Sequence, residues 1–192
     1  MLIWQRSVQR GCRKLHEFRG FGPEESGAHR LLQSLPDVMP ERRRDAALRY
    51  LLRNAADWPE DERNRLADRV LDVIGDPRFA AVFAAGSRAE VSIVGRLAPA
   101  DQPAVLVSGQ IDRLVVTETE VLIVDFKTNQ QPPSDLAEVP PAYVRQLALY
   151  RAVLGQLYPG RAVRAALLWT ETPEFMELPV SALDAMLPSQ HD

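Results

Sequence analysis

Two aspartates and one lysine stand near the ends of two adjacent apolar segments, and these residue types suit a site that handles charge. Asp112 lies toward the end of the first segment, and Asp125 and Lys127 close the second. A strand buries charge in such a place only with a compensating partner or a metal ion. These three side chains are therefore the first candidates for chemistry.

The two segments have the composition of strands joined by a tight turn. Val105–Val116 and Glu120–Lys127 are rich in Val, Ile and Leu, with Thr and Glu between them, which predicts a β-hairpin. Because alternate side chains of a strand share a face, Asp125 and Lys127 should point the same way. The hairpin reverses the chain, so we expect Asp112 to lie close to Asp125.

A simpler explanation is that Asp112 and Asp125 are surface residues near a turn and that Lys127 forms a salt bridge with one of them. Lysine usage favours a site, because Lys occurs only at positions 14 and 127 and every other basic residue is Arg. Lys is a compact charge whose pKa shifts when it is desolvated, whereas Arg stays protonated. Gly109, shortly before Asp112, also permits a close approach at the backbone.

A long helix is predicted after the hairpin, from about Pro140-Pro141 to about Tyr158, where Pro159-Gly160 ends it. Its predicted buried stripe consists of Val144, Leu147, Tyr150, Leu154 and Leu157. Gln146 and Tyr150 are four residues apart and share one face of this helix. Gln146 borders the stripe, so it is interpreted either as a site residue that contacts phosphate or water, or as a boundary glutamine beside a core tyrosine.

The order of these residues resembles the PD-(D/E)XK nuclease superfamily, in its RecB-like branch. The motifs are Gly109-x-x-Asp112, then Asp125-x-Lys127-Thr, then Gln146-x-x-x-Tyr150 on a helix. Within that branch the chain is similar to the C-terminal nuclease domains of the AddA subunits of bacterial AddAB helicase–nucleases. The resemblance covers roughly residues 27 to 178.

Two upstream residues enter only through this resemblance. The segment around His29 resembles an early helix of the family, and a histidine of that helix is a metal ligand in the family. Glu90 stands where the family places a glutamate that leads into its first strand, and it is interpreted as a second-metal or outer-sphere ligand. A structural histidine and a solvent-facing glutamate are the alternatives at these positions.

The resemblance implies an Mg²⁺-dependent nuclease in which Mn²⁺ can replace Mg²⁺. The implied catalytic residues are Asp112, Asp125, Lys127, Gln146 and Tyr150. The implied metal ligands are His29, Asp112, Asp125, the main-chain carbonyl of Phe126, and Glu90. Two carboxylates suit Mg²⁺ and leave positions for water and a phosphate oxygen. Lys127 would hold or help to deprotonate that water and stabilise developing negative charge.

Length and composition agree with a single domain. A chain of 192 residues fits one core of ordinary size, and no apolar run is long enough to cross a membrane. The single cysteine, Cys12, excludes an internal disulfide framework and a four-cysteine iron–sulfur cluster. We therefore expect a cytoplasmic protein without such a cluster.

The formal net charge of −3 is unusual for an independent nucleic-acid binder, which more often has a basic face. Either the acidic residues lie on helices away from the site, or other subunits deliver the DNA. The charge run Glu41–Asp45 is interpreted as a solvated helix face, with a phosphate-binding patch as the alternative. No Gly-x-x-x-x-Gly-Lys-[Ser/Thr] motif occurs, so the sequence carries no nucleotide-driven motor.

The pattern along the chain predicts an irregular leader over residues 1–25 and one domain over residues 26–192. Besides the long helix, the expected helices are Ser26–Leu35, Pro40–Ala56, Glu60–Ile74, Pro77–Ala85 and Val180–Leu187. Besides the hairpin, the expected strands are Glu90–Leu97 and Val163–Thr170. This layout predicts an α/β sandwich with a mixed sheet. It agrees with the restriction-endonuclease-like αβββαβ core, with additional N-terminal helices, that the resemblance implies.

The main hypothesis is an exonuclease domain that cleaves phosphodiester bonds of DNA single strands during double-strand-break repair. Its expected partners are DNA single strands at duplex ends, a helicase motor and an AddB-type subunit. One alternative is a catalytically silent DNA-end-binding or scaffolding module of the same fold. The other is a stand-alone recombination exonuclease.

Overall fold

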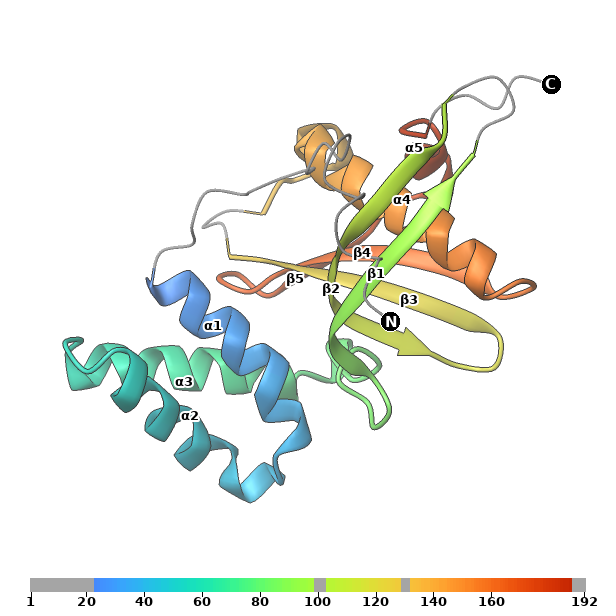
Figure 1. Ribbon diagram of the computed structural model, residues 1–192. Coiled ribbons are helices and arrows are strands. Elements are labelled where there is room, and N and C mark those ends of the chain that lie inside the picture. The colour runs from blue at the N-terminus through green and yellow to red at the C-terminus, as the bar shows by residue number, and fades with distance from the viewer. Residues whose placement is uncertain (1–22, 99–102, 129–131, 188–192) are drawn as a thin grey trace, which may run out of the picture.

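The structure is a computed structural model, and it describes residues 23–98, 103–128 and 132–187. Figure 1 shows a twisted sheet with three N-terminal helices on one side and a long helix on the other. The strands are β1 (Arg88–Leu97), β2 (Val105–Val116), β3 (Glu120–Lys127), β4 (Ala162–Trp169) and β5 (Glu174–Glu177). The helices are α1 (Pro23–Ser34), α2 (Pro40–Asn54), α3 (Glu60–Gly75), α4 (Pro141–Leu157) and α5 (Val180–Asp184), with short 3-10 helices η1 (Leu35–Asp37), η2 (Pro77–Phe79) and η3 (Leu136–Glu138).

The sheet has the strand order β1-β2-β3-β4-β5. The first three strands form an antiparallel meander, β4 runs parallel to β3, and β5 is antiparallel to β4. A parallel neighbour requires a crossover connection, and α4 provides it between β3 and β4. The predicted α/β class with a mixed sheet is therefore confirmed.

Strand β3 is covered on both faces and separates two hydrophobic clusters. Leu122, Val124 and Phe126 pack toward α1, α2 and α3, whereas Val121 and Ile123 pack toward α4. The alternation of side chains along a strand produces this division. Asp125 and Lys127 continue the α4 side, where they contact residues of that helix. Their predicted common face is therefore present.

Two elements differ from the sequence-based prediction. Strand β5 was not predicted, because it has only four residues, begins and ends with glutamate, and forms one edge of the sheet. The helix predicted over Pro77–Ala85 is reduced to η2 and the turns that follow it. Phe79 and Val82 are both buried there, and the Val82 N–H donates to the Phe79 carbonyl at 2.9 Å. This tighter i to i+3 spacing places both side chains in the core.

Smaller differences lie at element ends. Helix α1 begins at Pro23, three residues before the predicted start, and residues 1–22 of the predicted leader lie outside the described residues. Leu157, predicted in the buried stripe of α4, is 62% exposed because it is the last residue of that helix and lies beyond its buried part. In the described part of the chain, none of the helices has the length and apolarity that a membrane span needs.

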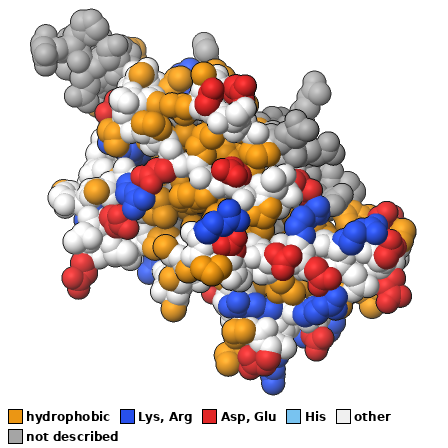
Figure 2. All heavy atoms as spheres, turned by 180° about the vertical axis from the view of Figure 1, so that it is seen from behind, with side chains coloured by type: hydrophobic (Ala, Val, Ile, Leu, Met, Phe, Trp, Pro, Cys, Tyr) orange, Lys and Arg blue, Asp and Glu red, His pale blue; other side chains and the backbone are white. Residues whose placement is uncertain are grey.

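The surface of α2 and α3 carries charges of both signs. Three acidic residues begin α3, and Arg44 of α2 lies 3.0 Å from Asp68 of α3. Figure 2 shows positive and negative side chains interspersed at the lower right, where these helices lie. The charge run Glu41–Asp45 is mostly exposed on α2, as a solvated helix face should be.

Candidate active site

The candidate site lies where β2 and β3 separate. Their pairing stops at Arg113 and Val124, while β3 stays paired with β4 as far as Lys127. The Asp112 carboxylate fills the gap, because its Oδ2 accepts a hydrogen bond from the Phe126 N–H at 2.8 Å. A side chain thus replaces the strand partner that this buried amide would otherwise lack.

The strands are distorted around Asp112. Residues two apart normally share a face of a sheet, yet Ile111 packs in the α4-side core while Arg113 lies over the Phe83 ring on the other side. On β1, Glu90 lies opposite Asp112, between two paired positions, and has a φ of +51°. A side chain other than glycine rarely adopts this left-handed conformation, and such strain is concentrated at functional sites.

Helix α1 brings His29 to Asp112. Leu31 and Leu32 are buried, and they fix the face of α1 that meets the sheet. The His29 Nε2 lies 2.9 Å from Asp112 Oδ1. The imidazole also meets the Phe126 ring edge-on, with ring centroids 5.7 Å apart. His29 therefore lies beside Asp112, and its role as a metal ligand, which the resemblance implied, stays a prediction.

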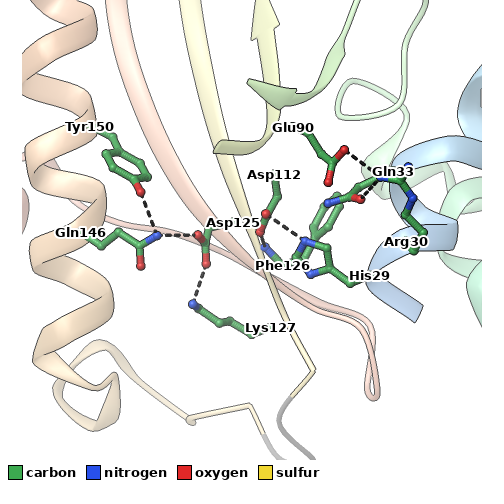
Figure 3. Close-up of polar contacts among 10 residues, drawn as sticks. All are labelled: His29, Arg30, Gln33, Glu90, Asp112, Asp125, Phe126, Lys127, Gln146 and Tyr150. Carbon is green, nitrogen blue, oxygen red and sulfur yellow. Dashed lines mark hydrogen bonds and ion pairs between the residues drawn. The ribbon is translucent and has the colours of Figure 1, made fainter. Parts of the chain in front are cut away.

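Asp125 is the centre of a second group of contacts, shared between β3 and α4 (Figure 3). Its Oδ2 lies 2.6 Å from the Nζ of Lys127, and its Oδ1 accepts a hydrogen bond from Gln146 Nε2 at 3.2 Å. Gln146 Nε2 also donates to the Tyr150 hydroxyl at 3.4 Å. Asp125 is buried and Lys127 is largely shielded from solvent, with 7% and 12% of their side chains exposed. Gln146 is therefore a neighbour of the site rather than only a boundary residue.

The pKa values of Asp125 and His29 reflect the electrostatics of the candidate site. Burial raises the pKa of Asp125 to about 6, an effect that Lys127 opposes and Asp112 reinforces. Burial is the largest influence on the His29 pKa and lowers it, but the hydrogen bond to Asp112 and the charges of Asp112, Asp125 and Glu90 raise it overall. Both pKa shifts reflect carboxylate charge that is shielded from water. A bound cation would stabilise that negative charge.

Gly109 is required because Tyr150 lies against the backbone of β2. A Cβ at position 109 would be 1.9 Å from the Tyr150 hydroxyl oxygen and 2.7 Å from its Cζ. The close approach expected at this glycine is therefore made by a tyrosine side chain from α4. Burial raises the pKa of Tyr150, so its hydroxyl remains a neutral hydrogen-bonding group.

Tyr143 belongs to the same group of contacts, although the sequence analysis gave it no role. The Lys127 Nζ lies 3.7 Å from the centroid of the Tyr143 ring. Tyr143, Gln146 and Tyr150 are three and four residues apart, so they share one face of α4. The helical spacing could have identified Tyr143 from the sequence, because a residue three positions before Gln146 lies on the same face of the helix.

Glu90 lies at the rim and turns toward α1. Its Oε2 accepts a hydrogen bond from Arg30 Nη1 at 2.7 Å, and its side chain is 41% exposed. Its charge still contributes to the raised pKa of His29. The structure thus brings His29 and Asp112 together and leaves Glu90 beside them, paired with an arginine.

The donor chemistry of the site fits a divalent cation. Asp112 and Asp125 lie where β2 and β3 separate, with the His29 imidazole beside Asp112. Mg²⁺ is commonly held through one or two carboxylates and water. Among the described residues, no group of three or more His, Cys, Asp or Glu side chains is arranged to hold an ion as it stands. His29 and Asp112 bind each other and Asp125 binds Lys127, so these groups would exchange partners for the ion. The raised pKa of Asp125 favours a cation here, because nearby positive charge stabilises the carboxylate.

Comparison with known proteins gives a match to one superfamily and weak similarity to solved structures. A family model described as the PD-(D/E)XK nuclease superfamily matches residues 14–186. No curated protein matches the chain. The solved structure of SSO0001 has 13% sequence identity and a TM-score of 0.34, with 83% of this chain and 71% of that chain covered. Protein VC1899 from Vibrio cholerae has 13% identity and a TM-score of 0.31, with 81% and 49% covered.

Proposed function

The chain belongs to the PD-(D/E)XK nuclease superfamily, and from this premise we propose that it is a DNA nuclease that uses Mg²⁺, with Mn²⁺ as a substitute. The observation that carries the proposal is the meeting of Asp112, Asp125 and Lys127 where β2 and β3 separate, with the Lys127 Nζ 2.6 Å from Asp125. Two carboxylates and an ammonium, shielded from water, are groups that suit metal-assisted cleavage of a phosphodiester.

Asp112 and Asp125 would hold the ion, with His29 and the main-chain carbonyl of Phe126 as further ligands and Glu90 as an outer ligand. When bound, the divalent ion neutralises charge on the phosphate and lowers the pKa of a bound water. The support from this chain is the contact of His29 with Asp112 at 2.9 Å and the hydrogen bond that orients Asp112 on the Phe126 amide.

Lys127 is the residue that we assign to the attacking water and the phosphate. Its ammonium donates hydrogen bonds and is 12% exposed, and a charge acts more strongly where solvent is excluded. Gln146 holds one oxygen of Asp125 from α4, and Tyr150 contacts Gln146 in turn. We assign these two residues to the orientation of the Asp125 carboxylate.

The natural substrate in this proposal is a DNA single strand that a helicase delivers, in an AddAB-type helicase–nuclease with an AddB-type partner subunit. The net charge supports delivery of the DNA by another subunit. A chain with a net charge of −3 has little general electrostatic attraction to DNA phosphates. The mixed charges on α2 and α3 agree with this, since they do not form a basic track. The chain alone should therefore cleave slowly.

Cleavage of linear single-stranded DNA by the full chain tests the proposal. We expect degradation with Mg²⁺ or Mn²⁺ that stops when EDTA is added, and little turnover with Ca²⁺. Cleavage that survives chelation would contradict the mechanism. DNA binding without any cleavage would support the silent binding module instead.

Two variants separate the assigned roles in the same assay. Asp112→Ala should lose Mn²⁺ binding together with activity. Lys127→Ala should lose activity but retain most Mn²⁺ affinity in calorimetry, because Lys127 acts on water and phosphate rather than on the ion. A Lys127→Ala variant that cleaves like the wild type would remove this strand from the active site.

A further inference from the structure

Lys127 is in contact with a carboxylate on one side and with an aromatic face on another. Its Nζ lies 2.6 Å from Asp125 Oδ2 and 3.7 Å from the centroid of the Tyr143 ring. A cation at this distance is attracted to the electron-rich face of a ring, and the attraction is stronger away from solvent. Tyr143 is 8% exposed, so this contact is shielded from water.

Asp125 has contacts other than the one with the Lys127 ammonium. One of its oxygens accepts a hydrogen bond from Gln146, and the proposed function also makes the carboxylate a metal ligand. A carboxylate that binds an ion holds a nearby ammonium less strongly, because its charge is shared. The face of the Tyr143 ring is a contact of Lys127 that does not depend on the charge of Asp125.

The fold holds the Tyr143 ring firmly. Pro140 is the N-cap of α4 and Pro141 is its first residue, and the Tyr143 N–H donates to the Pro140 carbonyl at 2.9 Å. The side chain then packs in the hydrophobic cluster between α4 and the sheet. A ring immobilised in this way limits the positions that the flexible Lys127 side chain can take.

We propose that Tyr143 is a positioning residue for Lys127, and that the face of its ring keeps the ammonium at the reacting water and phosphate while Asp125 serves the metal. The inference rests on the proposed function and adds to it a residue outside the motifs that the family resemblance supplied. The ring face is the required part, and the hydroxyl is not.

The test compares Tyr143→Phe, which keeps the face, with Tyr143→Leu, which keeps apolar bulk without it. Single-turnover cleavage of single-stranded DNA by the full chain with Mn²⁺ is the readout. Tyr143→Leu should be slower by about ten- to thirtyfold, the scale of a desolvated cation–π contact. Tyr143→Phe should stay within about twofold of wild type, because its ring face is unchanged. Mn²⁺ affinity and DNA affinity should change little in either variant.

A matched control is Tyr158→Leu, at the other end of α4. The guanidinium carbon of Arg161 lies 5.3 Å from the Tyr158 ring centroid, far from the site, so this variant should cleave at the wild-type rate. Melting temperatures of all variants separate loss of positioning from loss of folded protein.

The outcomes distinguish this inference from the function on which it rests. A wild type that never cleaves DNA overturns both. An active wild type with an equally active Tyr143→Leu overturns the inference alone. A Tyr143→Phe variant as slow as Tyr143→Leu assigns the effect to the hydroxyl and also overturns it.

Discussion

The Asp112 carboxylate divides its two oxygens between α1 and β3. Oδ1 lies 2.9 Å from His29 Nε2, and Oδ2 accepts the Phe126 N–H at 2.8 Å. A variant without this carboxylate leaves a partly buried amide without its partner, which destabilises the fold as well as the site. Replacing His29 leaves the hydrogen bond between the Phe126 N–H and Asp112 available, so a His29 variant probes metal binding more directly at the residue scale.

His29→Ala should weaken Mn²⁺ binding and lower the cleavage rate by roughly ten- to a thousandfold, the scale of one lost ligand or electrostatic contact. Only the neutral imidazole binds a metal, and the raised pKa of His29 makes protons stronger competitors at acidic pH. Calorimetry and cleavage rate on one sample, together with its melting temperature, check this. A structural histidine would give the opposite pattern, a lower melting temperature with a normal rate per folded molecule.

The metal-free protein should lose stability as the pH rises through the pKa of Asp125. Burial raises that pKa from its ordinary value of 3.8 to about 6. The folded state therefore binds this proton more tightly than the unfolded chain does, so the contribution of Asp125 to stability is fully present below about 3.8 and is lost as the pH rises past about 6.

Asp125→Asn removes this titration but also leaves the Lys127 ammonium without its carboxylate, a cost that does not follow the pKa of Asp125. Relative to the wild type, the variant should therefore gain in free energy of unfolding between about pH 4.5 and 7.5, by on the order of 1–3 kcal/mol, and urea unfolding of both proteins in EDTA at the two pH values measures this gain. His29, whose pKa is also raised, changes both proteins in the same direction. Mg²⁺ should stabilise the wild type more than the variant at the higher pH. A difference in free energy of unfolding between the two proteins that is the same at both pH values would contradict the prediction, because it would mean that neighbouring groups fully compensate the Asp125 charge.

At the scale of elements, the hairpin and α4 hold most of the site between them. The hairpin opens at Asp112, and the carboxylate of this residue occupies the gap. One face of α4 supplies three contacts: Tyr143 with Lys127, Gln146 with Asp125, and Tyr150 with the backbone at Gly109. Since these residues share one helix, any shift of α4 along the sheet changes all three contacts together.

Gly109→Ala should disturb this arrangement. The added Cβ would lie 1.9 Å from the Tyr150 hydroxyl oxygen, so the ring or the strand must move. We expect a loss of about 1–3 kcal/mol in the free energy of unfolding, as in other overpacked cores. Cleavage should fall as well, because Gln146 loses its neighbour. Gly155→Ala on α4 is the control, since nothing lies within 4 Å of its added Cβ, and it should be neutral or slightly stabilising.

At the scale of the whole molecule, the sheet is covered by α1–α3 on one face and by α4 on the other (Figure 1). A buried arginine lies on the three-helix side. Arg113 is 1% exposed, and its guanidinium nitrogens have no hydrogen-bond partner in the described part of the chain. The group lies 5.5 Å from the Phe83 ring centroid, and burial lowers its pKa. Desolvation of a charge costs several kcal/mol, whereas a cation–π contact returns about 2.

Arg113→Met should therefore raise the free energy of unfolding, by about 1–3 kcal/mol, because an apolar side chain of similar length needs no partner. Urea unfolding of the two proteins measures the difference. Arg161→Met is the matched control, since Arg161 also lies over a ring but donates to the Thr117 carbonyl at 2.6 Å. The control should be neutral or slightly destabilised. A destabilised Arg113→Met would show that the guanidinium is better compensated than its contacts indicate.

The sequence by itself determined the features that depend on one element at a time. The bounds of β2 and β3 agree with prediction, and so does the common face of Asp125 and Lys127. The neighbouring positions of Gln146 and Tyr150 followed from helical spacing in the same way. Local patterns suffice for these features because the direction of a side chain within a strand or helix depends on its own backbone. The αβββαβ order followed from the elements predicted along the chain and agreed with the family resemblance, and that resemblance alone added His29 and Glu90 to the candidate residues.

The tertiary structure alone decided which elements face each other. His29 meets Asp112 across 83 positions in the sequence, and this contact depends on how α1 packs on the sheet. The Tyr143 ring beside Lys127, and the pairing of Glu90 with Arg30, arise in the same way. Strand β5 forms where β4 offers it an edge, and its four residues are too short a pattern to predict it from the sequence. Such contacts are set by the packing of buried side chains between layers, and periodicity within one element carries no information about the layer that covers it.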